Sequence, residues 1–229
     1  MFRISLRGTI LAALGLLALA LVAFSILALW THWEPARMPR DMKALHDLDA
    51  KVRKEAVTDL GQMGPKAKEA IPELINALGD NDVGVRRRAA WALGHIGPEA
   101  KSAVPALTLT LEDPDVRGAA ALALGRMGAE AREAIPALLK VLDDPREIMR
   151  GDAIFALGQI GPQAKEAVPA LIKALGDPQF TVRLVAAEAI GKIGLEAKQA
   201  IPELERLAEK DPDESVRKIA RDALEKIRK

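Results

Sequence analysis

The sequence predicts an all-α protein, a right-handed α-solenoid of six helix pairs preceded by a single N-terminal transmembrane helix. Two observations lead to this prediction. First, a Val-Arg pair, an Ala-rich segment ending in Leu-Gly-x-Ile/Met-Gly and a later Ile/Val-Pro recur with a period of about 33 residues, and self-similarity at such a period is typical of stacked helix pairs. Second, a long uncharged stretch near the N-terminus is almost entirely apolar.

The N-terminal part divides into a short basic tail (1–9), an apolar run (10–31) and a short linker (32–37). The apolar run is long enough to cross about 30 Å of hydrocarbon as a helix. Trp30 and Trp33 stand where an interfacial aromatic belt would lie. We therefore expect an uncleaved signal anchor. The alternative is a cleavable signal peptide, which normally has a shorter apolar region and small residues before the cut.

The orientation of this span is predicted from the basic residues beside it. Arg3 and Arg7 favour a cytoplasmic N-terminus, although Arg37, Arg40 and Lys43 follow the span and weaken the asymmetry. A very short basic tail is typical of signal anchors. We therefore expect a single-pass membrane protein whose solenoid is extracytoplasmic (periplasmic).

The solenoid is expected to occupy residues 38–229 as six repeats. In the repeat that begins at Asp144, an Ala-rich helix should run from about Met149 to Ile160, where Gly161 ends it, and Pro169 should lie near the start of a second helix. Gly after a helix end and Pro near a helix start are the usual boundaries. At 100° per residue, one face of the Ala-rich helix is apolar and forms a core stripe. In the second repeat this stripe is Val85, Ala89, Ala92, Leu93 and Ile96.

Two charged positions also recur. The arginines are Arg53, Arg86, Arg117, Arg150, Arg183 and Arg217, and an aspartate usually stands six residues earlier: Asp47, Asp80, Asp144, Asp177 and Asp211. We interpret these as structural, with each Asp capping a helix start and each Arg pairing with Asp or loop carbonyls of its own or a neighbouring repeat. The alternative is an anion-binding ladder. The third repeat is two residues shorter in its turn, before Arg117, and predicts a local change in the solenoid.

Composition excludes several classes of function. There are 33 Lys and Arg against 32 Asp and Glu, so the net charge gives no general attraction to nucleic acid, and acidic residues also interrupt the basic ones. The chain has no Cys, and its three His are scattered without partners at metal-ligand spacing. We therefore predict no catalytic residue, no metal, no cofactor and no nucleic-acid partner, and we identify no small-molecule substrate.

The candidate site lies on the Ala-rich helices, at positions that point away from the core stripe. Three consecutive repeats carry a bulky apolar residue at one such position: Trp91, Leu122 and Phe155. Gly118 and Gly151, one turn earlier, are expected to leave room beside Leu122 and Phe155. The strip is bordered by Arg87, His95, Arg126 and Gln159. This composition suits an extended peptide or an amphipathic helix, and the alternative is that these side chains pack against neighbouring helices.

The segments Val85-Arg-Arg-Arg-Ala-Ala-Trp-Ala-Leu-Gly-His-Ile-Gly97 and Val104-Pro-Ala-Leu107 resemble HEAT repeats, especially the short bacterial kind called phycobilin-lyase HEAT-like repeats. The resemblance covers residues 38–228 and implies a binding scaffold whose Ala-rich helices line the concave surface. We predict a membrane-anchored, non-enzymatic scaffold that binds a peptide or helix of a partner protein on its concave face. The alternative is a lyase-type enzyme or enzyme accessory of the phycobilin-lyase HEAT-like family.

Overall fold

The computed structural model describes residues 37–229, and all regular secondary structure in this range is helical. Residues 37–44 are helical. The following elements are α2 (Ala50–Gln62), η1 (Gly64–Ala70), α3 (Ile71–Ala77), α4 (Val83–Ile96), η2 (Gly97–Ala103), α5 (Val104–Thr110), α6 (Arg117–Met127), η3 (Gly128–Ala134), α7 (Ile135–Val141), α8 (Glu147–Ile160), η4 (Gly161–Ala167), α9 (Val168–Ala174), α10 (Phe180–Ile193), η5 (Gly194–Ala200), α11 (Ile201–Lys210) and α12 (Glu214–Arg228).

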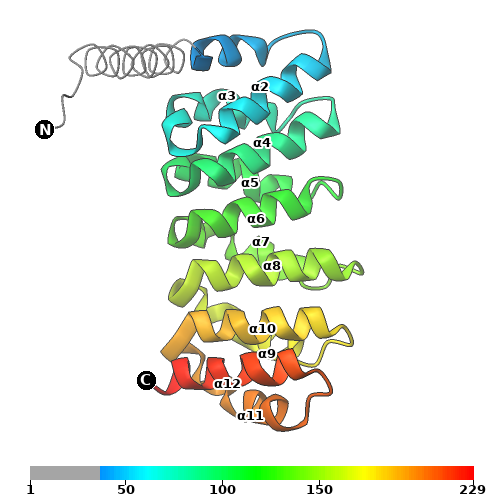
Figure 1. Cartoon of the computed structure of the whole chain (residues 1–229), viewed down its shortest axis with the longest axis vertical. Helices are drawn as coiled ribbons and strands as arrows, with labels where there is room; N and C mark the ends of the chain where they lie inside the picture. The colour runs from blue at the N-terminus through cyan, green and yellow to red at the C-terminus, as the bar shows by residue number, and fades with distance from the viewer. Residues whose placement is uncertain (1–36) are drawn as a thin grey trace, which may run out of the picture.

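The helices form two layers of a solenoid (Figure 1). Helices α2, α4, α6, α8, α10 and α12 stack on one another in one layer, and α3, α5, α7, α9 and α11 lie behind them. Together with the helical residues 37–44, which precede α2, they make six pairs in the described part of the chain. The predicted all-α solenoid of helix pairs is therefore confirmed.

The predicted basic tail (1–9), transmembrane helix (10–31) and linker up to residue 36 lie outside the described residues. Within residues 37–229, none of the helices combines the length and the apolar character needed to cross a membrane. Arg37 is the first described residue, and its guanidinium lies 2.6 Å from the Asp59 carboxylate in α2. This ion pair ties the start of the first helix pair to its second helix.

The Ala-rich helices end at the predicted glycines. Helix α8 ends at Ile160, and Gly161 follows with a φ of 74°. Side chains other than hydrogen are strained in this conformation, so that glycine is the residue best suited to end the helix. After the 3₁₀ segment η4, Pro169 lies in the first turn of α9, where its missing N–H is not needed. The proline therefore begins the second helix and does not kink it.

The other glycine of the repeat serves close packing between repeats. A Cβ atom on Gly158 in α8 would lie 2.8 Å from both Cα and Cβ of Ala189 in α10. A Cβ on Gly94 in α4 would likewise lie 2.8 Å from Cα of Ala123 in α6. Consecutive Ala-rich helices thus approach closely because glycine faces alanine, and larger side chains would separate them.

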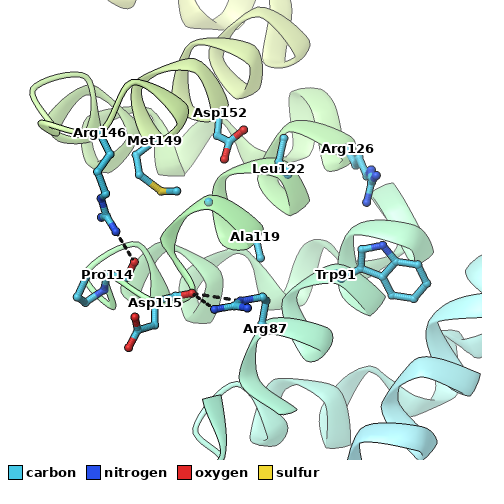
Figure 2. A pocket seen from close by; sticks show the side chains of 11 residues that line it. Arg87, Trp91, Pro114, Asp115, Ala119, Leu122, Arg126, Arg146, Met149 and Asp152 are labelled. Atoms are coloured by element: carbon cyan, nitrogen blue, oxygen red, sulfur yellow. Dashed lines mark hydrogen bonds between the residues drawn. The ribbon is translucent and has the colours of Figure 1, made fainter. Parts of the chain in front are cut away.

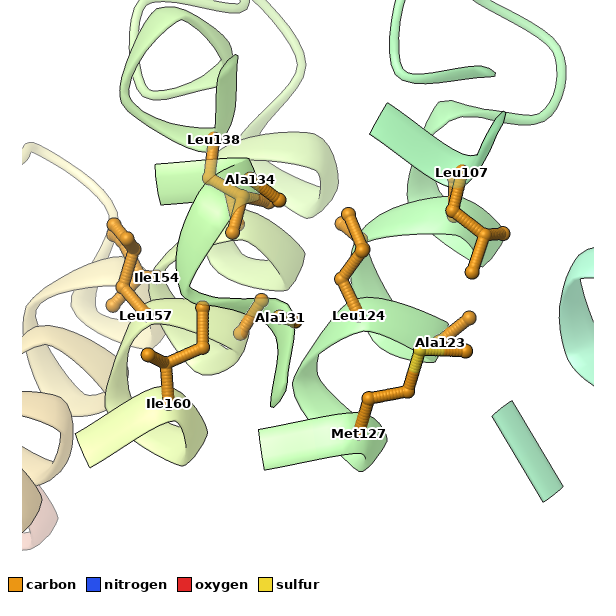
Figure 3. Close-up of a cluster of buried hydrophobic side chains, with 14 of the residues drawn as sticks. Leu107, Ala123, Leu124, Met127, Ala131, Ala134, Leu138, Ile154, Leu157 and Ile160 are labelled. Atoms are coloured by element: carbon orange, nitrogen blue, oxygen red, sulfur yellow. The ribbon is translucent and has the colours of Figure 1, made fainter. Parts of the chain in front are cut away.

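The core lies between the two layers and confirms the predicted stripe. All five stripe residues of the second repeat are at most 1% exposed: Val85, Ala89, Ala92, Leu93 and Ile96. Leucines of the other layer complete the core, and Figure 3 shows Leu107 and Leu138 in one cluster with Leu124 and Leu157. Because one cluster of buried residues runs through the whole stack, each repeat depends on its neighbours for burial.

The recurring arginines link each repeat to the next. The ion pairs are Arg53–Asp80 (2.7 Å), Arg86–Asp113 (2.9 Å), Arg117–Asp144, Arg150–Asp177 (2.9 Å) and Arg183–Asp211 (2.8 Å). The same guanidinium also donates within its own turn, as Arg150 Nη1 does to the carbonyl oxygen of Asp144 at 3.0 Å. The structural interpretation of the arginines is therefore confirmed, and in the first five repeats the carboxylate partner belongs to the following repeat.

The prediction that the recurring aspartates cap helix starts is wrong. Asp80 accepts a hydrogen bond from the backbone N–H of Asp82 (2.8 Å), two residues later, and so shapes the turn before α4. The N-cap of α4 is Asp82 itself, whose carboxylate accepts from the N–H groups of Gly84 and Val85 at 2.8 and 3.1 Å. The recurring aspartate thus lies two residues too early to cap the helix and is positioned to receive the arginine of the preceding repeat.

Candidate functional site

A hollow lies at the shortened third repeat, on the face of the even-numbered helices. Helix α6 has 11 residues, whereas α4, α8 and α10 have 14 each. The hollow has a volume of about 470 Å³ and is bordered by α4, the turn before α6, α6 and α8 (Figure 2). Its lining residues are Arg87, Trp91, Pro114, Asp115, Gly118, Ala119, Leu122, Arg126, Arg146, Met149 and Asp152. We call it the central hollow.

Arginines from both neighbouring repeats hold the short turn at the edge of the central hollow. Arg87 donates to the carbonyl oxygen of Asp115 from Nε and Nη2, at 3.3 and 3.1 Å. Arg146 Nη1 donates to the carbonyl oxygen of Pro114 at 3.0 Å, and Figure 2 shows both interactions. These two side chains therefore hold the short turn in place beside the hollow.

Two further hollows extend the central one along the same face. The N-terminal hollow, of about 480 Å³, is lined by Lys54, Thr58, Gly84, Arg87, Arg88 and Trp91. The C-terminal hollow, of about 360 Å³, is lined by Leu122, Glu147, Ile148, Gly151, Asp152, Phe155, Thr181, Val182, Val185 and Glu188. The central hollow shares Arg87 and Trp91 with the first and Leu122 and Asp152 with the second. The three therefore form one groove from α2 to α10.

Seven of the nine predicted site residues line this groove. Arg87, Trp91, Gly118, Leu122 and Arg126 line the central hollow, and Gly151 and Phe155 line the C-terminal one. His95 lies beside the groove, where its ring stacks on Trp91 with centroids 3.8 Å apart and its Nδ1 lies 3.1 Å from Arg126 Nη1. It therefore positions two lining residues. Gln159 is exposed and lines none of these hollows.

The apolar strip of Trp91, Leu122 and Phe155 is half-buried. Trp91 leans on the preceding repeat, where a Cβ atom on Gly61 would lie only 2.3 Å from its Cζ3. Phe155 likewise packs on α6, where a Cβ atom on Gly125 would lie 3.4 Å from Cδ1 of the Phe155 ring. One edge of each ring thus packs on a neighbouring helix and another lines the groove. Packing therefore accounts for part of each ring, and peptide binding stays a prediction.

The two glycines predicted to leave room differ from each other. At Gly118 the prediction is wrong, because a Cβ atom there would lie 2.6 Å from Oδ2 of Asp152 and 3.2 Å from Cε of Met149. The space beside Leu122 is thus filled by two side chains of α8. At Gly151 no heavy atom of the described residues lies within 4 Å of such a Cβ, so the predicted room beside Phe155 exists.

Asp152 is the site residue that sequence reasoning missed. It is half-buried, lies between the central and C-terminal hollows, and forms no hydrogen bond or ion pair with any residue from 37 to 229. Burial raises the pKa of its carboxyl group to about 6. The one signal in the sequence was Gly118 of the preceding repeat, whose missing side chain leaves space for the Asp152 carboxylate. The sequence did not show which residue fills that space, because this depends on how the helices stack.

In residues 37–229, no group of three or more His, Asp or Glu is placed to hold a metal ion.

The stacked helix pairs and the open groove define the chain as an α-solenoid repeat protein. The HEAT-repeat family model matches residues 42–111, 99–158 and 135–225, which together make up most of the sequence. The chain therefore belongs to the HEAT-repeat family, as its motifs predicted.

Several solved structures are similar to this chain. In the complex of CpcE and CpcF of phycocyanin lyase from Nostoc sp. PCC7120, one chain is 30% identical with a TM-score of 0.61, and the match covers 82% of this chain and 75% of that one. A computationally designed armadillo repeat protein for modular peptide recognition is 26% identical with a TM-score of 0.63, covering 82% and 98%. An engineered protein is 27% identical with a TM-score of 0.66, covering 83% and 96%. Among curated proteins, none matches significantly.

Proposed function

We propose that the protein is a non-enzymatic interaction scaffold whose groove binds a peptide or helical segment of a partner protein. The observation that carries this proposal is the continuity of the groove over five stacked helices, with Trp91, Leu122 and Phe155 along it and open space at Gly151. Contiguous apolar surface bordered by polar groups is typical of interaction sites, and Trp is a frequent energetic anchor. The likeness to a designed protein for modular peptide recognition supports the same function.

Gly151→Leu tests the groove directly. Leucine favours the helix more than glycine does, and it would project into the open space of the C-terminal hollow. Random peptides displayed on phage are selected on the full-length chain, and their affinities are then measured by fluorescence anisotropy. We expect Gly151→Leu to weaken the selected peptides roughly 10-fold or more, about 1.4 kcal/mol, because it occupies part of their site.

The matched control is Lys218→Leu, an exposed position in α12 that corresponds to Gly151 in the repeat. This variant adds the same side chain outside the groove and should leave the affinities unchanged. Selection of no peptide, or of peptides that bind Gly151→Leu as well as the wild-type chain, would contradict the proposed function. Circular dichroism of both variants confirms that the helices are retained.

A second candidate function is favoured by the similarity to a chain of the phycocyanin lyase complex. In this proposal the protein is a lyase-type enzyme, or an enzyme accessory, that acts on a tetrapyrrole. Incubation of the full-length chain with a phycobilin, followed by absorbance spectroscopy, separates the two candidates. A red-shifted or stably bound pigment supports the lyase-type function, and an unchanged spectrum supports the non-enzymatic scaffold.

We also propose that residues 10–31 anchor the protein in a membrane as a single span, with the solenoid on the extracytoplasmic side. The length and apolar character of this stretch support the anchor, and the basic residues before it support the orientation. The protein should stay in the membrane fraction after carbonate extraction and should retain its original N-terminus. Protease added to spheroplasts should digest the solenoid, whereas protection of the solenoid until the cells are broken would place it in the cytoplasm.

A further inference from the structure

We propose that the groove selects partner segments that place a lysine or arginine side chain against Asp152, where the central and C-terminal hollows meet. This inference rests on the proposed function and specifies the chemistry of the partner. Asp152 is the residue of the scaffold that selects a basic side chain at one position of the bound segment.

The geometry presents the Asp152 carboxylate to the groove. The carboxylate extends from α8 over Gly118 of α6, and Figure 2 shows it in the hollow between Leu122 and Met149. Met149 Sδ and Cε lie 3.3 and 3.2 Å from the Cβ position of Gly118, and so close the side of the hollow toward the turn. The carboxylate therefore faces the groove between the apolar side chains of Leu122 and Met149.

The cations around Asp152 are engaged elsewhere. Arg146 Nη2 binds the Asp144 carboxylate at 3.0 Å, while Nη1 of the same side chain binds the carbonyl oxygen of Pro114. Arg87 binds the carbonyl oxygen of Asp115, and Arg126 contacts His95. A partly buried carboxylate without a counterion is energetically costly. The burial that raises the pKa of Asp152 therefore also favours the binding of a cation beside it.

The C-terminal hollow favours a cationic occupant over an anionic one. Its charged lining residues are Glu147, Asp152 and Glu188, all acidic. Glu188 is paired with Lys192 at 2.9 Å, and Glu147 is exposed to solvent. Leu122 and Phe155 line the same hollow and offer apolar surface to the methylene stem of a lysine or arginine, whose charged head would reach Asp152. An anionic side chain would meet repulsion from these carboxylates, and the Lys192 ammonium, 5.4 Å from the centroid of the Phe155 ring, is already paired with Glu188.

The test uses the full-length chain and the peptides selected by phage display. We expect lysine or arginine to be enriched at one position of the selected peptides. Replacing that residue of the peptide by norleucine, and replacing Asp152 by Asn, should each weaken binding roughly 10- to 100-fold, the range for a hydrogen bond between charged groups. The two changes should be non-additive, because both remove the same interaction. Asp222→Asn, an exposed carboxylate on α12, is the control for the loss of one negative charge.

The pH dependence gives a second readout. Asp152 shares the central hollow with Arg87 of α4, Asp115 of the turn before α6, Arg126 of α6 and Arg146 just before α8. It shares the C-terminal hollow with Glu147 of α8 and Glu188 of α10. Asp152 has a pKa of about 6 in the free protein, so affinity for the basic peptide should rise as the pH increases from 5 to 7.5. Asp152→Asn should lose this dependence.

Two results distinguish this inference from the proposed function. Peptides that depend on Gly151 but bind equally with lysine or norleucine, or that carry Asp or Glu at the enriched position, would overturn the role of Asp152 and leave the groove intact. Peptides that are insensitive to Gly151→Leu would overturn both, because they bind outside the groove.

Discussion

Replacing Leu157 by Ala is expected to lower the free energy of unfolding by about 2–5 kcal/mol, the range for large-to-small changes at buried leucines. Leu157 lies in α8, has no exposed surface and belongs to the cluster shown in Figure 3. The glycine–alanine contacts that hold α8 close to α10 restrict collapse of the structure around a cavity. The decrease in the free energy of unfolding therefore includes the cost of the cavity as well as the lost burial of the side chain.

The measurement is guanidinium-induced unfolding of the full-length chain, followed by circular dichroism. Leu109→Ala is the matched control, since Leu109 is 74% exposed and its truncation should change stability by no more than about 0.5 kcal/mol. Because the repeats share one core, the Leu157 variant should lose stability across several repeats. Equal midpoints for the two variants would show that the central repeats do not depend on this cluster.

Arg183→Ala is expected to destabilise the chain by roughly 2 kcal/mol more than Arg217→Ala. Arg183 binds Asp211 of the next repeat with two hydrogen bonds of 2.8 and 2.9 Å, and the Asp211 side chain is only 4% exposed. The expected cost lies between those of exposed and fully buried ion pairs. Within residues 37–229, Arg217 of the last repeat donates only to carbonyl oxygens of its own turn, those of Asp211 and Pro212. The difference between the variants thus isolates the link between repeats.

This difference should depend on pH with a defined sign. The hydrogen bond from Arg183 lowers the pKa of Asp211 from its ordinary value of 3.8. A carboxyl group with a lowered pKa contributes stability that is complete above 3.8 and is lost as the pH falls through the lowered value. Guanidinium-induced unfolding of both variants at pH 7 and in strong acid measures the difference with Asp211 charged and with Asp211 protonated. A difference between the variants that stays constant over this range would show that the Asp211 charge does not contribute.

The groove shows how packing and binding use the same side chains. Trp91 covers Gly61 with one edge of its ring and lines two hollows with the rest. Truncating it would therefore lower stability as well as affinity. Gly151 and Asp152 are better probes, because Gly151 has open space around it and Asp152 lacks a partner within the described part of the chain.

The sequence by itself determined the local structure and the repeat. Helix boundaries followed from Gly161 and Pro169, and the buried face followed from the spacing of residues such as Val85 and Leu93. These features depend on backbone conformation and helical periodicity, which act over a few residues. The period made stacking the only way to bury the stripe, so the solenoid was also predictable.

Only the tertiary structure decided which side chains meet between repeats. In the first five repeats the recurring Arg pairs with an Asp of the following repeat, and Asp152 with Met149 fills the space above Gly118. These contacts depend on the rotation and offset between helices about one repeat apart in the chain, which are set by ångström-scale packing such as that of Gly158 on Ala189. Sequence spacing gives the face on which a residue lies, but the neighbour that occupies the adjoining space is determined by the packed core as a whole.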